Sequence, residues 1–129
     1  MNSLEDFLNL PDVEGLEKDV FVSKRLGTFT VSALTADEYS SYLKRARKVD
    51  KKGKIDFDAN LFNLLIIDAK LIKPDFSNAE FLKKAKCSTA KEFISRKLLP
   101  GEIQELSDKI LEFSGFDKDI NEDIDEAKN

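Results

Sequence analysis

The 129-residue sequence contains no histidine, no tryptophan and a single cysteine, Cys87. Without histidine, the most common general base and the most common nitrogen ligand of metal ions are missing. A lone cysteine cannot form an internal disulfide, so we interpret Cys87 as a buried or incidental thiol. The five glycines are dispersed, and neither GxGxxG nor a Walker loop occurs. We therefore predict a non-catalytic protein with no cofactor and no metal.

Long apolar runs are absent as well. No stretch approaches the roughly 20 apolar residues of a membrane span, and the N-terminus is acidic where a signal peptide is basic. Hydrophobic residues make up 41% of the chain and charged residues 36%, which supplies enough apolar material for a core. The length is close to the commonest size of one domain. We expect one globular domain in the cytoplasm, without membrane contact.

The N-terminal part of the sequence predicts a short helix followed by a β-hairpin. Residues 3–10 indicate a helix that ends before Pro11. Residues 19–27 and 28–34 are rich in β-branched and aromatic side chains that alternate with polar ones, with a break near Gly27. A hairpin is marginal alone and must rest on helices. For the short helix we expect packing through Leu4, Phe7 and Leu8.

Five further helices follow from local signals in the sequence. Capping boxes, in which a side chain at each end of a four-residue motif satisfies a free amide, occur in TADE and SNAE. Between them lies a segment that is apolar on almost every side, which predicts a helix buried at the centre of the core. The expected helices start at Thr35 (ending near Val49), Asp58 (ending near Ile72), Ser77, Thr89 and Pro100 (ending near Phe113, with Gly115 as terminator).

These elements predict an α+β fold that is mostly helical, with an N-terminal β-hairpin packed on a cluster of about five helices. Residues 1–115 form the single domain in this interpretation. Residues 116–129 form an acidic C-terminal tail or connector.

Charge is distributed unevenly, although the net charge is only −4. Residues 44–54, KRARKVDKKGK, hold seven basic side chains against Asp50. Such a run could bind the phosphates of a nucleic acid, attract an acidic protein surface such as another copy's tail, or be a solvated helix end and loop. No aromatic residue is interleaved, and the isoelectric point near 5.0 does not suit a dedicated nucleic-acid binder. We favour the solvated helix end.

The acidic C-terminal tail carries apolar residues at every fourth position, namely Phe116, Ile120 and Ile124. In a helix these side chains would form one apolar edge that docks on a partner or another subunit. The alternative is a loosely held end whose isoleucines merely touch the domain. The same segment imitates the first positions of a calcium loop, but it has neither the glycine nor the bidentate glutamate of such a loop.

The C-terminal third, KLLPGEIQELSDKILEFSGFDKDINEDIDEAKN, resembles the tail assembly chaperones of PBSX-like defective prophages and related phages of Gram-positive bacteria. Upstream support comes from VSKRL in the hairpin, the LTADE helix start and the segment IDFDANL. The resemblance covers most of the chain, and LLPGE and GFDKDI are its distinctive words. The hairpin turn departs from it, because related chains have a longer, charged turn.

The resemblance implies a non-catalytic protein of the host bacterial cytoplasm that is absent from the mature virion. Such a protein would coat the tape-measure protein and help to recruit tail-tube subunits, and self-association is left open. A small nucleic-acid-binding or regulatory module that uses Lys44 to Lys54 is the alternative. LLPGE places two leucines at a helix junction where full burial is awkward. We therefore predict partner binding by Leu98, Leu99, Ile103 and Leu106, together with Phe116, Ile120 and Ile124.

The resemblance also generates a prediction about the gene. In many long-tailed phages, ribosomes slip back one base near the end of this reading frame and append a second domain. Ala127, Lys128 and Asn129 permit a run of adenines in the message, on which two transfer RNAs could pair again after slipping. We expect the gene to contain this run, followed by an open shifted frame. An AAG codon for Lys128, or a stop within a few shifted codons, would contradict the prediction.

Overall fold

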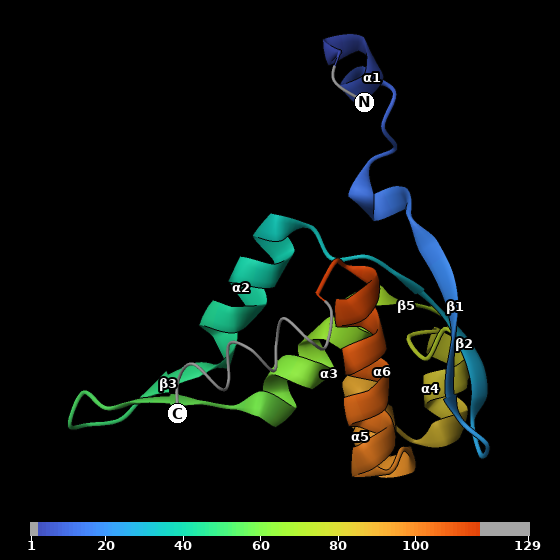
Figure 1. Ribbon diagram of the computed structural model, residues 1–129. Helices are drawn as coiled ribbons and strands as arrows, with labels where there is room; N and C mark the ends of the chain where they lie inside the picture. Colours follow the sequence, from blue (N-terminus) through green and yellow to red (C-terminus); the bar gives the residue numbers. More distant parts are fainter. Residues whose placement is uncertain (1–2, 117–129) are drawn as a thin grey trace.

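The computed structural model describes residues 3–116, in which six α-helices accompany two small antiparallel sheets (Figure 1). This architecture confirms the predicted α+β, mostly helical fold. The helices are α1 (Leu4–Leu8), α2 (Ala36–Ala46), α3 (Ala59–Lys70), α4 (Ala79–Ala85), α5 (Ala90–Lys97) and α6 (Pro100–Phe113), with a 3-10 turn at Val13–Gly15. The strands are β1 (Glu17–Ser23), β2 (Gly27–Ser32), β3 (Arg47–Val49), β4 (Ile55–Phe57) and β5 (Leu71–Lys73).

The predicted hairpin is confirmed as β1 and β2, which pair antiparallel around a turn closed by Gly27 at φ +79°. Its inward side chains, Val20 opposite Phe29, are buried against the helices. A third strand, β5, pairs with β2 where the sequence predicted the end of a helix. Because a two-stranded hairpin is marginal in water, this added strand contributes to the stability of the sheet.

Helix α3 is the centre of the core, as its apolar sequence predicted. Helix α6 lies alongside it, and both stand beside the sheet (Figure 1). Helix α6 packs against both α3 and the hairpin, and the contacts are made by apolar side chains. The buried members of this layer are Phe62, Leu64, Leu65, Ile66 and Ile67 from α3 and Ile103, Leu106 and Ile110 from α6.

Two polar groups of α3 are buried, and each has a partner. The Asn63 amide donates to Gln104 Oε1 at 3.1 Å and accepts from the Ser107 hydroxyl at 2.9 Å. Lys70 is paired with Glu38 at 2.6 Å between Nζ and Oε1. Burial alone would raise the pKa of Glu38, but the hydrogen bonds from Lys70 and Thr35 bring that pKa below its ordinary value. Both polar sites therefore link α3 to a neighbouring helix.

Most helix starts lie where the capping signals placed them. Thr35 and Glu38 form the predicted capping box at α2, and Thr89 caps α5. The prediction for α4 was wrong by one residue. Asn78 caps that helix by accepting from the Phe81 amide, while the Ser77 hydroxyl donates to Asp75 in the preceding loop.

Two other predictions were wrong. The helix expected to reach Val49 ends at Ala46, because residues 47–49 leave the helix to pair with residues 55–57. This pairing forms a projecting β-ribbon, here called the β3–β4 arm (residues 47–57). The side chains of α1 were expected to pack, but Leu4, Phe7 and Leu8 are all exposed because α1 stands away from the body (Figure 1).

Replacing core leucine Leu106 by alanine tests this account of the core. Leu106 is fully buried between α3 and the hairpin, so Leu106→Ala should lower the free energy of unfolding by about 2–5 kcal/mol. The matched control is Leu99→Ala, since Leu99 is 58% exposed, and its effect should stay within about 0.5 kcal/mol. Urea denaturation followed by circular dichroism measures both. Equal losses in the two variants would contradict the assigned core.

Candidate partner-binding surfaces

The residues predicted to bind a partner divide into buried and exposed positions. Leu98, Ile103 and Leu106 belong to the core, which leaves their side chains almost no free surface in this conformation. Leu99 is 58% exposed. Of the four residues predicted to bind a partner around LLPGE, only Leu99 is exposed. Partner binding by Leu99 stays a prediction.

Local backbone geometry explains why Leu98 is buried while the adjacent Leu99 is exposed. Helix α5 ends before Leu98, and both Leu98 and Leu99 are extended before Pro100 starts α6. Successive side chains of an extended backbone point to opposite sides. Leu98 therefore enters the core while Leu99 faces solvent. There it lines an open hollow of about 560 Å³ with Arg25 and the first turn of α6.

The carboxylate of Glu102 lines this hollow and is held by several hydrogen bonds. Glu102 is almost completely buried and accepts hydrogen bonds from the Ser23 hydroxyl at 2.6 Å and from the Leu99 amide at 2.8 Å. The Arg25 guanidinium forms an ion pair with it and also donates to the Lys97 carbonyl at 3.0 Å. The turn of the hairpin is thereby tied to the junction between α5 and α6, which holds Leu99 in place.

These donors favour the ionised form of Glu102. The hydrogen bonds from Arg25, then Ser23 and the Leu99 amide, lower its pKa from 4.5 to about 2. The carboxylate therefore remains charged in the folded protein well into the acid range.

The tail edge predicted from Phe116, Ile120 and Ile124 is described only at its first residue. The Phe116 ring lies against Tyr39 at 4.6 Å between ring centroids, and its amide donates to the Leu111 carbonyl. The packed body thus includes Phe116. Ile120 and Ile124, like the rest of the acidic tail, lie outside the described residues, so docking by this edge stays a prediction.

The β3–β4 arm presents the basic run on a β-ribbon. Its cross-strand pairs are Arg47 with Phe57, Lys48 with Asp56 and Val49 with Ile55. Since side chains alternate between the faces of a ribbon, Val49, Ile55 and Phe57 share one face, and all three are exposed. The Phe57 ring also packs against the Phe62 ring of α3, with 5.5 Å between the ring centroids. An apolar face therefore runs from the arm to the body.

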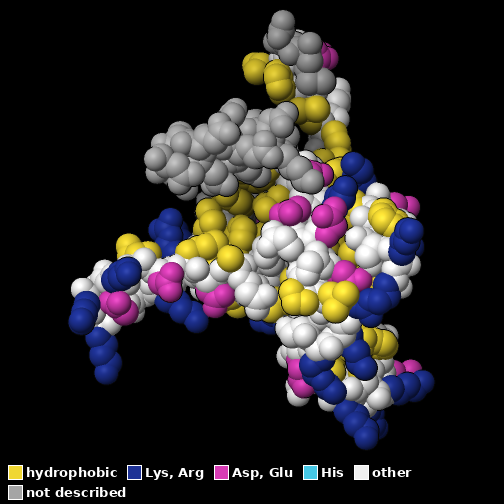
Figure 2. All heavy atoms as spheres, turned by 60° about the horizontal axis from the view of Figure 1, so that its bottom comes forward, with side chains coloured by type: hydrophobic (Ala, Val, Ile, Leu, Met, Phe, Trp, Pro, Cys, Tyr) yellow, Lys and Arg dark blue, Asp and Glu magenta, His cyan; other side chains and the backbone are white. Residues whose placement is uncertain are grey.

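Lysines and arginines surround this apolar face. Figure 2 shows basic side chains gathered toward the end of the β3–β4 arm, at the left of the view. The turn is ordered by Asp50, whose carboxylate accepts from the amides of Lys52 and Lys54 at 2.9 Å each. Sequence reasoning missed the ribbon, although Gly53 and the alternation of Ile55, Asp56 and Phe57 were signals for it.

A second projection is the N-terminal arm (residues 3–16). It consists of α1, the 3-10 turn and the linking residues. It projects from the body at the N-terminal end of β1 (Figures 1 and 2). Six large apolar side chains of this arm are exposed, which is unusual for a segment of this length. They are Leu4, Phe7, Leu8, Leu10, Val13 and Leu16.

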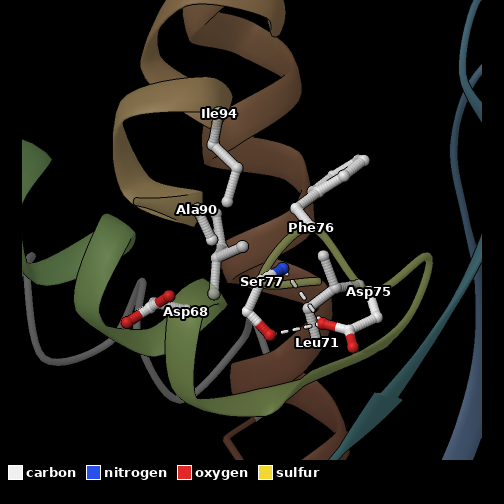
Figure 3. A pocket seen from close by; sticks show the side chains of 8 residues that line it. Asp68, Leu71, Asp75, Phe76, Ser77, Ala90 and Ile94 are labelled. Atoms are coloured by element: carbon white, nitrogen blue, oxygen red, sulfur yellow. Dashed lines mark hydrogen bonds between the residues drawn. The ribbon is translucent and has the colours of Figure 1, made fainter. Parts of the chain in front are cut away.

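The pocket in Figure 3 is much smaller than a ligand site. It lies between the end of α3, the loop after β5 and α5, and it encloses about 20 Å³, room for about one water molecule. Asp75 and Ser77 on its rim bond to each other. Residues 3–116 contain no group of three or more His, Cys, Asp or Glu side chains arranged to hold a metal ion. Of the helices in that range, none has both the length and the apolar character to span a membrane.

The protein is a small, mostly helical α+β domain with a closed core. Its exposed apolar surface lies outside that core, mainly at the hollow beside Leu99 and on the two arms. The chain belongs to the family of phage XkdN-like tail assembly chaperone proteins, whose family model matches residues 4–128. The resemblance noted from LLPGE and GFDKDI is confirmed. The fold is similar to the crystal structure of the protein yqbn, with a TM-score of 0.66 and 23% identity over 91% of this chain and 99% of that one. No curated protein matches the sequence.

The hydrogen bonds of Glu102 predict a pH-dependent contribution to stability. Because its pKa is lowered on folding, ionised Glu102 stabilises the folded state above its unfolded pKa of 4.5, and this contribution is lost as the pH falls from about 5 toward 2. Glu102→Gln should lower the stability at pH 7 and flatten its decline across that window. Urea midpoints measured at several pH values report both effects.

The control for this experiment is Glu105→Gln. Glu105 lies one turn further along α6 in a partly exposed pair with Lys109, so its replacement should change the midpoints little. Parallel pH profiles for the wild type and Glu102→Gln would contradict the role assigned to Glu102.

Proposed function

We propose that this member of the tail assembly chaperone family is a non-catalytic protein that coats the tape-measure protein and helps to recruit tail-tube subunits. The observation that carries the proposal is the placement of exposed apolar side chains. The core is closed, yet large hydrophobic residues remain on the β3–β4 arm, on the N-terminal arm and at Leu99. Exposed apolar patches of this kind are typical of protein-binding surfaces.

The chemistry of these surfaces suits an amphipathic helix as partner. Leu99 stands at an open hollow whose rim is charged by Lys24, Arg25 and Glu105. An apolar helix edge could contact the leucine while its polar residues meet the rim, as in helix-in-groove recognition. Many copies along one long tape-measure helix would add avidity to weak single contacts. Recruitment of tail-tube subunits rests on the sequence resemblance.

In this proposal the protein acts in the host bacterial cytoplasm and is absent from the mature virion. The acidic segment 116–129 would serve as a tail or as a connector to an appended domain. Its block of like charges resists collapse and would keep such a domain apart from the body.

The nucleic-acid alternative rests on the lysines of the β3–β4 arm. The same arm, however, also carries the exposed apolar residues Val49, Ile55 and Phe57 on one face, a combination that suits an acidic and apolar protein surface. Retention on DNA or RNA that falls steeply with salt would favour the alternative.

The tape-measure proposal predicts the effect of Leu99→Asp. Aspartate is favoured at a helix N-cap, which is where Leu99 lies, so the fold should persist by circular dichroism. The carboxylate would repel an apolar helix from the hollow. We expect co-purification of the tape-measure protein from a co-expressing strain to fall at least about tenfold, since tenfold corresponds to 1.4 kcal/mol, less than the burial of one leucine.

The matched control is Phe21→Asp, because Phe21 has the same 58% exposure but lies on the outer face of β1. This variant should co-purify with the tape-measure protein as the wild type does. A folded Leu99→Asp variant with undiminished co-purification would reject the assignment of the hollow. If the wild type itself neither binds nor solubilises the tape-measure protein, the proposed function is wrong.

A further inference from the structure

A row of aromatic rings connects the last described residue of the chain to the β3–β4 arm. The Phe116 ring lies 4.6 Å from the ring of Tyr39 on α2, measured between centroids. Tyr39 in turn lies 6.1 Å from Phe62 of α3, and Phe62 lies 5.5 Å from Phe57 of the arm. Three ring-to-ring steps therefore separate the start of the acidic segment 117–129 from the arm.

The apolar face of the arm continues this aromatic row outward. Phe57 reaches the body at Phe62, whereas Val49 and Ile55 pair with each other further out along the ribbon. All three residues of the face, Val49, Ile55 and Phe57, are exposed. Because a ribbon of two strands is marginal in water by itself, a cover over this face would stabilise the arm.

The arm and the acidic segment are complementary in charge. Residues 47–57 hold five basic side chains against two aspartates, and residues 117–129 hold six carboxylates against two lysines. Within residues 3–116, Lys48 is the one basic side chain of the arm that forms an ion pair, with Asp58 at 3.3 Å. Asp50 is occupied by the amides of its own turn. The described part of the chain therefore leaves most of the arm's positive charge without a partner.

We propose that the acidic segment 117–129 folds back on its own molecule, with Ile120 and Ile124 against the apolar face of the arm and its carboxylates against the lysines of the turn. A segment of this length spans about 20 Å as a helix and about 45 Å when extended. Either conformation is long enough to follow the aromatic row to the arm. In a helix, residues four apart are separated by about 6 Å along the axis, which matches the ring-to-ring steps.

The tail of the same molecule is favoured over that of a second copy because Phe116 tethers it beside the face. A short flexible tether gives an effective concentration on the order of 1 mM. Like charges keep the segment from collapsing on itself, and the lysines of the arm offset this repulsion. Released from the arm, the same segment would be a solvated connector. A protein that binds the arm must displace the tail, which lowers its apparent affinity.

A spin label on the tail tests the proposal in the full chain and without any tape-measure protein, so its failure is distinct from failure of the proposed function. The label is attached to Ala127→Cys in a Cys87→Ser background, because Cys87 is the only cysteine of the sequence. The amide NMR signals of residues 47–57 should lose most of their intensity by paramagnetic relaxation. Those of α4, which lies across the body from the arm, should keep theirs (Figure 1). Unchanged signals from the arm would overturn the proposal.

A mixed sample separates contacts within one molecule from contacts between molecules. Isotope-labelled chain without the spin label is mixed with an equal amount of spin-labelled chain that is invisible in the spectrum. The signals of residues 47–57 should now keep their intensity. If they broaden as in the first experiment, the tail of a second copy covers the arm, and the proposal is wrong.

Serine substitutions test the apolar contact. Ile120→Ser with Ile124→Ser, in the spin-labelled chain, should restore most of the intensity of the arm signals. The matched control is Asn121→Ser with Asn129→Ser, which places two serines in the same segment without removing an apolar side chain. Its arm signals should stay broadened. Equal broadening in the two variants would contradict the assigned role of the isoleucines.

Charge reversal tests the electrostatic contact. Lys51→Glu with Lys52→Glu should release the tail and restore the arm signals. Lys83→Glu with Lys84→Glu on α4 makes the same change of charge away from the arm and should leave the tail docked. Raising the salt from about 50 mM to about 500 mM should also weaken the broadening, because exposed charges are screened. Broadening that resists both reversal at the arm and salt would contradict the proposed pairing of charges.

Discussion

The fold depends on the burial of helix α3 on all sides. A helix with Phe62, Leu64, Ile66 and Ile67 on its surface cannot remain in water, and it is too apolar to be covered by one neighbour. Helices α2, α5 and α6 together provide the cover. The same burial requires internal partners for Asn63 and Lys70, and these come from α6 and α2. The arrangement of most of the domain follows from enclosing this one helix.

Enclosing α3 also decides which residues remain for partners. Leu98, Ile103 and Leu106 cover α3 and the hairpin, so they are committed to the core. Apart from Phe21 on the outer face of β1, the large exposed apolar residues of the described chain lie on the two arms and at the junction between α5 and α6. Glu102 connects the two roles. It is buried at the edge of the core, yet its hydrogen bonds position the backbone that exposes Leu99.

The sequence predicted those features that depend on a few neighbouring residues. Thr35 with Glu38, Thr89 and Pro100 marked helix starts because their capping chemistry is local. The alternation in β1 and β2 identified the hairpin for the same reason. Asn78 was missed because Ser77 is an equally good cap by type, and only the bond from Ser77 to Asp75 separates them. Each of these features depends on residues only a few positions apart in the sequence.

Features that depend on distant residues were not predictable in this way. Residues 47–49 have a sequence compatible with a helix, and they form a strand only because residues 55–57 lie opposite. The spacing in α1 indicated an apolar face but could not show that the body offers it no surface. The opposite fates of Leu98 and Leu99 required the backbone angles at the junction.

Placing the exposed apolar residues on arms has an energetic consequence. The arms contribute little to the core, so substitutions there change the folding free energy little. Their apolar area becomes favourable only when a partner removes it from water. Binding can therefore vary while the fold stays constant, because the side chains that stabilise the domain and those free to contact other proteins are different residues. Leu98 and Leu99 show this separation within two adjacent positions, since one belongs to the core and the other to the surface.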